Sequence, residues 1–176
     1  GFSTSRTLNH RASDGRPTPT LTAAEDELLQ IGLALAAEGR GVLQVVSDFR
    51  DVAAEWTMLR RLVERTRRPL SISLVQSDRR PDGYRALLAA LGDAARAGLP
   101  IKAQVCGRAV GIVMGLATSI HPFSAHPRFR ELAGLPLPQL CARLGEPAVR
   151  ASLCAAERDA NGLSALLHNF DKMFVL

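Results

Sequence analysis

The stretch VLQVVSDF, Val42 to Phe49, is an apolar run that ends in the polar pair Ser47-Asp48. Some thirty residues later the chain repeats this pattern in LSISLVQSD, Leu70 to Asp78. A third short run, PIKAQVCGR, occupies residues 100–108. Apolar runs of this length, bounded by Gly, Pro and polar residues, are typical of strands in a parallel sheet.

The segments between these runs have the apolar spacing of amphipathic helices, and they end at Gly or Pro. The expected helices are residues 23–38, 51–66 and 81–97, and the expected strands are 42–47, 70–75 and about 101–106. This alternation predicts an α/β fold of successive βα units. Because sequential strands tend to be neighbours and a parallel connection needs a crossover, we expect these strands to be parallel, adjacent and in chain order.

Polar residues collect where these strands end. Ser47, Gln76, Gln104 and Arg108 are expected at one rim, since ligands of parallel α/β folds bind at the carboxyl ends of strands. The strands themselves are expected to be buried on both faces. An alternative for Asp48 and Asp78 is that each caps the following helix. Capping explains the glutamines less well, because they lie within or at the tip of apolar strands.

Composition narrows the class of protein. The 176 residues are 47% hydrophobic and 22% charged, which fits one medium globular domain or part of a larger one. The net charge is +5, but the arginines are dispersed, so no nucleic-acid partner is expected. No apolar run is long enough for a membrane span. Three cysteines without CxxC spacing favour the cytoplasm. The absent initial Met fits a processed, trimmed or fragmentary chain.

The repeating pattern weakens after residue 106. Residues 1–106 are therefore expected to hold the βα units, and residues 107–176 to form a Gly- and Pro-rich excursion of the same domain with short helices near 127–134, 136–144 and 147–157. His121 and His126 have no helical pairing and are expected in turns, not as metal ligands. No nucleophile elbow, Walker loop, HExxH or dinucleotide fingerprint is present.

Several sequence segments resemble segments of the N-acyl-D-amino-acid deacylases (D-aminoacylases) of the amidohydrolase superfamily. In these enzymes a barrel strand ends in a Gly-Phe-Ser motif. A loop with prolines follows, and the next helix begins near a Thr and an acidic pair. The matching residues are Gly1 to Thr4, Pro17 to Pro19 and Glu25 to Leu28. GVLQVVSDF, RPLSISLVQSD, IKAQVCGRAVGIVMGL and HPFSAHPRFRELAGLPL are similar to consecutive later units, so the likeness covers nearly the whole chain.

The resemblance implies a partial (β/α)8 barrel and a hydrolase in which zinc activates the water that attacks an N-acyl amino acid. The chain would supply the middle of the barrel, without the His-x-His strand, the Cys ligand and the Ser-Asp-x-Gly strand of that family. It adds Ser3, at a strand tip, to the substrate-binding candidates Ser47, Gln76, Gln104 and Arg108. Arg108 is suited to clamp a carboxylate. The catalytic residues stay unassigned.

Two positions depart from the deacylase pattern. Leu74 and Arg108 stand about where the deacylases have metal-binding histidines, so this segment alone is expected neither to bind zinc nor to be active. Four strands cannot close a barrel, which predicts a homo-oligomer or pairing with the remainder of a barrel. Two alternatives stay open: a non-catalytic half-barrel that serves as an interaction module, and an unrelated open α/β sheet that binds a small ligand.

Overall fold

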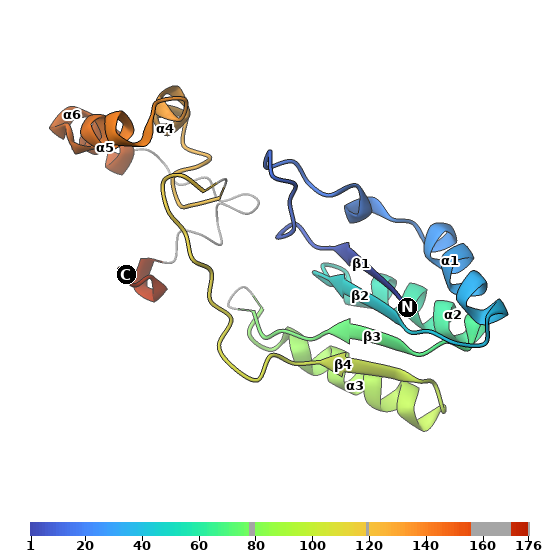
Figure 1. Ribbon diagram of the computed structural model, residues 1–176. Helices are drawn as coiled ribbons and strands as arrows, with labels where there is room; N and C mark the ends of the chain where they lie inside the picture. The colour runs from blue at the N-terminus through green and yellow to red at the C-terminus, as the bar shows by residue number, and fades with distance from the viewer. Residues whose placement is uncertain (78–79, 119, 156–169, 176) are drawn as a thin grey trace. The chain divides into compact units, whose positions relative to one another are not determined.

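The structure, a computed structural model, describes residues 1–77, 80–118, 120–155 and 170–175 (Figure 1). The chain divides into two compact units. The sheet unit consists of residues 1–12 and 16–110, and the C-terminal unit of residues 13–15 and 111–176. Each unit has an apolar core of its own.

Four parallel strands form the sheet (Figure 1). They are β1 (Phe2–Arg6), β2 (Leu43–Ser47), β3 (Leu70–Ser73) and β4 (Ile101–Gln104). Their spatial order, β1-β2-β3-β4, is the order along the chain. The predicted adjacent, parallel and sequential strands are therefore confirmed, and β3 and β4 end earlier than expected.

The connections between strands are helical, as the periodicity predicted. They are α1 (Glu25–Ala37), preceded by the short 3-10 helix η1 (Pro19–Thr22), then α2 (Val52–Thr66) and α3 (Gly83–Arg96). Gly39 and Gly98 follow α1 and α3 with φ of 66° and 70°, a left-handed conformation that ends a helix at little steric cost for glycine. Arg67 takes the same role after α2 with φ of 53°.

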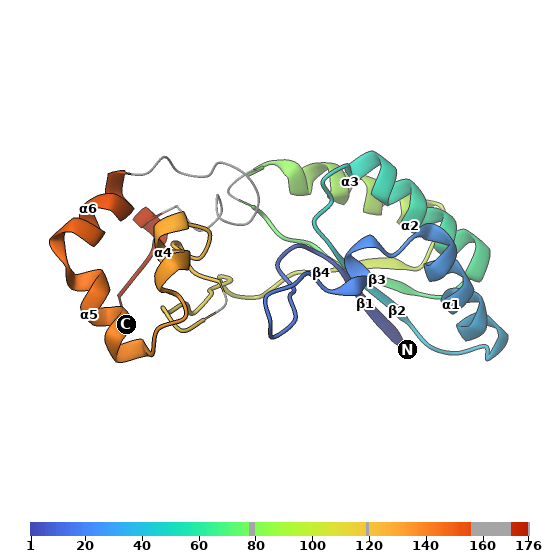
Figure 2. The ribbon, with the colours of Figure 1, turned by 90° about the horizontal axis from the view of Figure 1, so that it is seen from above.

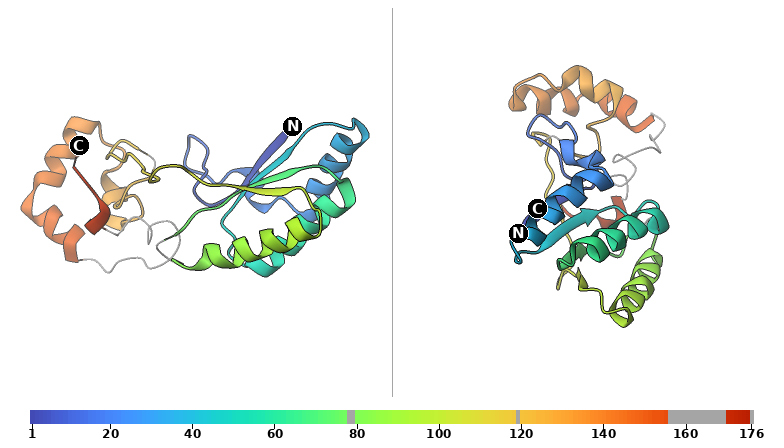
Figure 3. Two further views of the ribbon diagram at one scale, coloured as in Figure 1. Left: turned by 90° about the horizontal axis from the view of Figure 1, so that it is seen from below. Right: turned by 90° about the vertical axis from the view of Figure 1, so that its right-hand side faces the viewer.

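The three helices pack on one face of the sheet (Figures 2 and 3). Alternate strand residues point toward them and are buried, as Val45 and Ile72 are, whereas the preceding residues Gln44 and Ser71 are only partly buried. The expectation that the strands are buried on both faces is therefore wrong. In a doubly wound sheet helices cover both faces, whereas in a (β/α)8 barrel they lie only outside. One-sided cover and sequential order make this unit a sector of a barrel-type sheet.

Gly32 allows α1 to approach α2 closely. A Cβ at this position would lie 2.8 Å from Cγ2 of Thr66 and 3.1 Å from Cδ1 of Leu62. Both neighbours belong to the apolar face of α2, and both are buried. The absence of a side chain at Gly32 thus sets the helix–helix spacing above β2.

Within its described residues, the C-terminal unit contains three short helices, α4 (Pro127–Leu132), α5 (Leu137–Gly145) and α6 (Pro147–Ala155), and the 3-10 helix η3 (Phe170–Lys172). Its core is small and is made by Phe129, Leu132, Leu140 and Val149. The three predicted helices are confirmed: α4 ends two residues earlier than predicted, α5 is displaced by one residue, and α6 is described as far as Ala155. No helix within the described ranges is both long and apolar enough to cross a membrane.

Candidate functional site

The four parallel strands end at one edge of the sheet (Figure 1), and most of the predicted binding residues lie at or beyond these strand ends. Ser47 and Gln104 are the last residues of β2 and β4. Gln76 and Arg108 lie in the segments that follow β3 and β4. Because all strands are parallel, their carboxyl ends meet at this one edge.

Ser3 is the exception, and its predicted position is wrong. It is the second residue of β1, in register with Gln44, and the strand continues to Arg6. The Gly-Phe-Ser motif thus begins a strand instead of ending one. The physical reason is that Phe2 already belongs to the ladder, where its N–H donates to the carbonyl of Val42 at 3.0 Å.

The side chains of Ser47 and Gln104 lie on opposite faces of the sheet. The hydroxyl of Ser47 donates to a carboxylate oxygen of Glu55 in α2, so this side chain lies on the helix-covered face. Gln104 lies on the other face, where its Oε1 accepts a hydrogen bond from Nε2 of Gln44 at 3.0 Å. The two residues share an edge of the sheet and not a binding surface.

The two residues in the loops make only local contacts. Nε2 of Gln76 donates to the carbonyl of Pro81 at 3.1 Å, and Nη1 of Arg108 donates to the carbonyl of Ala109 at 3.2 Å. Both side chains are exposed. Across the part of the chain that the structure describes, no acidic group lies within 4.0 Å of the Arg108 guanidinium, which leaves it available to an anionic ligand.

Asp48 ties together the loops at this edge. Its carboxylate accepts hydrogen bonds from Oγ1 of Thr7 at 2.5 Å and from the backbone N–H of Leu8 at 3.0 Å. Its backbone carbonyl accepts one from Nη2 of Arg80 at 3.0 Å. The segments that follow β1 and β3 are thereby attached to the end of β2. Asp48 is a structural anchor whose partners lie far away in the sequence.

The capping interpretation of Asp48 is therefore wrong. The N-cap of α2 is Asp51, whose Oδ1 accepts the N–H of Ala54 at 2.9 Å. Asp78, the other residue with this interpretation, lies outside the described residues. Phe49, between Asp48 and the N-cap Asp51, is a buried residue with φ of 45°. A non-glycine residue in this region carries backbone strain and persists only where surrounding contacts hold it.

The face of the sheet opposite the helices is predominantly polar. Register aligns Ser3, Gln44, Ser71 and Lys102 in one row across the four strands, and Ser73 lies beside Gln104 nearer the carboxyl edge. The hydrogen bond between Gln44 and Gln104 spans β3. The signal for this surface was the alternation in LSIS and IKAQ, because a half-buried strand has an apolar residue at every second position.

This open face can bind a polar ligand through several groups. The two glutamine amides each offer a donor and an acceptor, and the hydroxyls of Ser71 and Ser73 offer both as well. Lys102 adds a positive charge, and no described acidic group lies within 4.0 Å of its Nζ. The surface is suited to an uncharged polar or anionic molecule. The sequence interpretation missed Ser71, Ser73 and Lys102, because it treated these strands as buried on both faces.

The described residues do not fit a metal site. Nowhere among them do three His, Cys, Asp or Glu side chains come together in a way that could hold a metal ion. Leu74 follows β3 and is buried, and its N–H donates to the carbonyl of Gln104 at 2.9 Å. Arg108, after β4, is a cation that would repel a metal ion.

Comparison with known proteins adds no relative. The chain matches no known family, no curated protein and no solved structure.

Proposed function

We propose that the sheet unit is a sector of a barrel enzyme that hydrolyses the amide of an N-acyl amino acid. One observation carries the barrel part of this proposal: within the described sheet unit, four parallel strands follow chain order and have helices on one face only. Such a sheet curls toward its uncovered face, and in a closed barrel that face becomes the interior. The amide-hydrolase part is supported by the sequence resemblance and by the polar groups of the open face.

The proposed substrate offers partners for these groups. An N-acyl amino acid carries one amide and one carboxylate. The amides of Gln44 and Gln104 can donate to a carbonyl oxygen and accept from an N–H. The guanidinium of Arg108, which has no acidic partner among the described residues, suits the carboxylate because its planar fork binds carboxylates in a bidentate manner. These residues would bind and orient the substrate.

Metal chemistry is not assigned to these residues. Zinc in the resembling family activates the attacking water, but the described residues offer no set of ligands that fits it. A metal would have to be held by other residues, in the remainder of a barrel. The barrel sector would then contribute substrate binding and not the hydrolytic step.

The experiment compares the purified 176-residue chain with the product of the whole open reading frame that encodes it. Both are assayed for acetate release from N-acetyl-D-amino acids, before and after chelation and zinc addition. We expect the whole product to be active, to lose activity on chelation and to regain it with zinc. We expect the 176-residue chain alone to contain no stoichiometric zinc by elemental analysis and to be inactive.

Variants test the substrate-binding role. Arg108→Met should raise KM for the acetylated amino acid about tenfold or more, because a charge-assisted hydrogen bond contributes about 1.5–3 kcal/mol. The matched control is Arg96→Met, since Arg96 is an exposed arginine near the end of α3 that pairs with Asp93. An active whole product whose KM is unchanged by Arg108→Met would contradict the clamp. A whole product without activity would contradict the enzymatic assignment.

A non-catalytic half-barrel is the second candidate. The observation that favours it is the identity of Leu74 and Arg108, which cannot bind metal, at the positions that resemble the family's metal ligands. Among the described residues no further strand pairs with the outer strands β1 and β4, whose edges can pair with another strand. An inactive whole product that sediments as a stable dimer or larger assembly would favour this candidate.

A further inference from the structure

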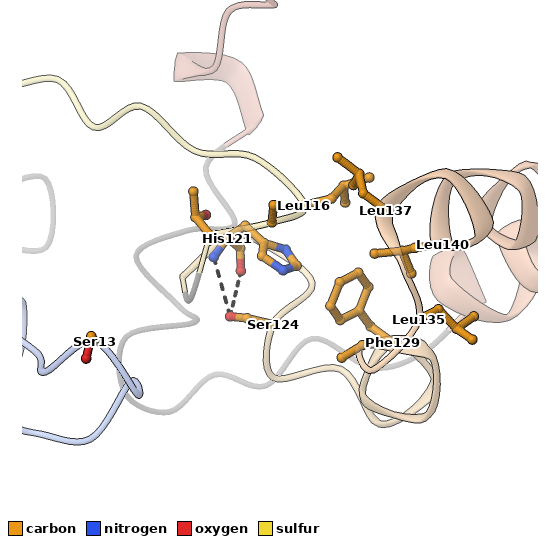
Figure 4. A pocket seen from close by; sticks show the side chains of 11 residues that line it. Ser13, Leu116, His121, Ser124, Phe129, Leu135, Leu137 and Leu140 are labelled. Carbon is orange, nitrogen blue, oxygen red and sulfur yellow. Dashed lines mark hydrogen bonds between the residues drawn. The ribbon is translucent and has the colours of Figure 1, made fainter.

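An open pocket of about 410 Å³ lies in the C-terminal unit, beside α4 and α5 (Figure 4). Its wall is mixed. Seven of its eleven lining residues are apolar, among them Leu116, Phe129 and Leu140, and the others are Ser13, Thr118, His121 and Ser124. The volume falls within the range of about 300–1,000 Å³ that is usual for small-molecule sites. Neither the sheet nor the barrel proposal makes use of this pocket.

The imidazole ring of His121 gives this pocket a buried polar group that could bind a ligand. The side chain is buried, with 4% of the residue exposed, and the edge of its ring meets Phe129 at a centroid distance of 4.5 Å. Nδ1 accepts a hydrogen bond from the backbone N–H of Phe123 at 3.3 Å. In the neutral ring the proton is therefore on Nε2, which makes that nitrogen a donor.

The neutral form of His121 is the form present at pH 7. Burial disfavours the charged imidazolium and lowers the pKa of His121 below its ordinary value of 6.5. No carboxylate among the described residues pairs with the ring to oppose this effect. The pocket therefore presents a neutral N–H group and no positive charge.

The hydroxyl groups of Ser124 and Thr118 at the pocket are already engaged. Oγ of Ser124 donates to the carbonyl of His121 at 2.8 Å, as Figure 4 shows. Oγ1 of Thr118 lies 2.8 Å from the carbonyl of Gly115 and 2.9 Å from that of Ile120. Within the described part of the chain, no acceptor takes the Nε2–H of His121. The Nε2–H of His121 is thus a free donor at a pocket that has seven apolar lining residues.

We propose that this pocket binds a small uncharged molecule with an apolar body and a carbonyl oxygen, which accepts a hydrogen bond from Nε2–H of His121. None of the lining residues is Asp, Glu, Lys or Arg, which disfavours a charged ligand, because a charge without a partner loses its hydration. A ligand without an acceptor would leave the imidazole N–H unpaired, and that loss disfavours its binding. Aryl and alkyl ketones, esters and amides meet both requirements. The proposal does not depend on the amide-hydrolase assignment.

The test uses two probes of nearly equal shape, acetophenone and ethylbenzene, which differ in having a carbonyl or a methylene beside the ring. Their Kd values for the 176-residue chain are measured by ligand-observed NMR. We expect acetophenone to bind more tightly. In His121→Phe, which keeps an aromatic ring and removes the donor, the Kd of acetophenone should rise about five- to tenfold. The Kd of ethylbenzene should stay within about twofold.

A control variant and a measurement on the unaltered chain complete the test. His126→Phe is the matched control, because His126 caps α4 through Nδ1 and does not line the pocket. It should leave both Kd values unchanged. In the unaltered chain with 15N-labelled histidine, saturating acetophenone should shift the Nε2 resonance of His121 and not that of His126.

Three results would overturn the proposal. The first is an Nε2 resonance of His121 that does not respond to acetophenone. The second is an equal loss of affinity for both probes in His121→Phe, which would mean that the ring acts through shape alone. The third is binding of neither probe by the unaltered chain, as expected if another part of the chain fills the pocket.

Discussion

The two faces of the sheet are built from alternate residues of the same strands, yet they have opposite characters. On one face Val45 and Ile72 are buried beneath α1, α2 and α3. On the other, Ser71, Lys102 and Gln104 are polar and only partly covered or exposed. The difference shows that the position of the helical connections determines which alternate residues of each strand form the core. The remaining residues, on the uncovered face, can contact a ligand, line the interior of a barrel or pack against a further chain.

The largest expected effect is on the covered face. Ile72→Ala should lower the free energy of unfolding by about 2–5 kcal/mol, because Ile72 is 0% exposed and its removal leaves a cavity between sheet and helices. The adjacent substitution Ser71→Ala, on the open face, should change it by no more than about 0.5 kcal/mol. Urea denaturation of both variants gives the two values.

This pair can also break the comparison. A cost of about 2 kcal/mol or more for Ser71→Ala would mean that the open face is covered in solution, since exposed polar residues rarely matter so much. Sedimentation of the unaltered chain would then show whether a second copy covers it.

The next effect tests the close approach of α1 to α2 above the covered face. Gly32→Ala should destabilise the chain by about 1–3 kcal/mol, because the new Cβ would lie 2.8 Å from Thr66 and the helices would have to separate. Gly92→Ala in α3 is the matched control, since its Cβ would meet only the mobile end of Arg96 at 3.5 Å. That control should stabilise the chain by about 0.5–1 kcal/mol through helix propensity. Thermal unfolding distinguishes the two signs.

A smaller effect is expected at the carboxyl edge, where the two faces meet. Asp48→Ala should cost about 1–2 kcal/mol, because the hydroxyl of Thr7 and the N–H of Leu8 lose their acceptor. Asp93→Ala, which removes an exposed carboxylate paired with Arg96, should cost no more than about 0.5 kcal/mol. Equal costs in urea denaturation would show that Asp48 is not an anchor.

The smallest effect is expected on the open face. In a double-mutant cycle, Gln44→Ala and Gln104→Ala should couple by no more than about 0.5 kcal/mol, because water replaces an exposed hydrogen bond at little cost. Lys102→Ala in place of Gln104→Ala provides the uncoupled control. A coupling well above 1 kcal/mol would mean that this pair is dehydrated, and the open face would then resemble the covered one.

The sequence predicted the secondary structure and the strand order of the sheet unit well. The strands at 42–47, 70–75 and 101–106, the helices between them, and the parallel sequential order are confirmed within a few residues. These features depend on signals from near neighbours, namely apolar periodicity, Gly and Pro stops and crossover length. Four of the five candidate binding residues lie at or beyond strand ends for the same reason.

The errors arose where a local pattern had two interpretations. Short apolar strands in an α/β alternation predict burial on both faces, although Ser71 and Ser73 alternate with Leu70 and Ile72. The family resemblance predicts Ser3 at a strand end, whereas the strand begins at Phe2. In each case the burial or pairing of a residue depends on partners that the local pattern does not specify.

By itself, the sequence determined which segments are strands and helices and that the strands follow one another in parallel. Only the tertiary structure decided which partners the polar residues find. Asp48 contacts Thr7 across 41 positions, and Gln44 contacts Gln104 across 60. Among the described residues, the Nε2–H of His121 keeps no acceptor at its pocket. The physical reason is the distance along the chain over which each effect acts. Periodicity and capping act within a few residues, whereas strand register and helix packing bring together side chains that are distant in the chain.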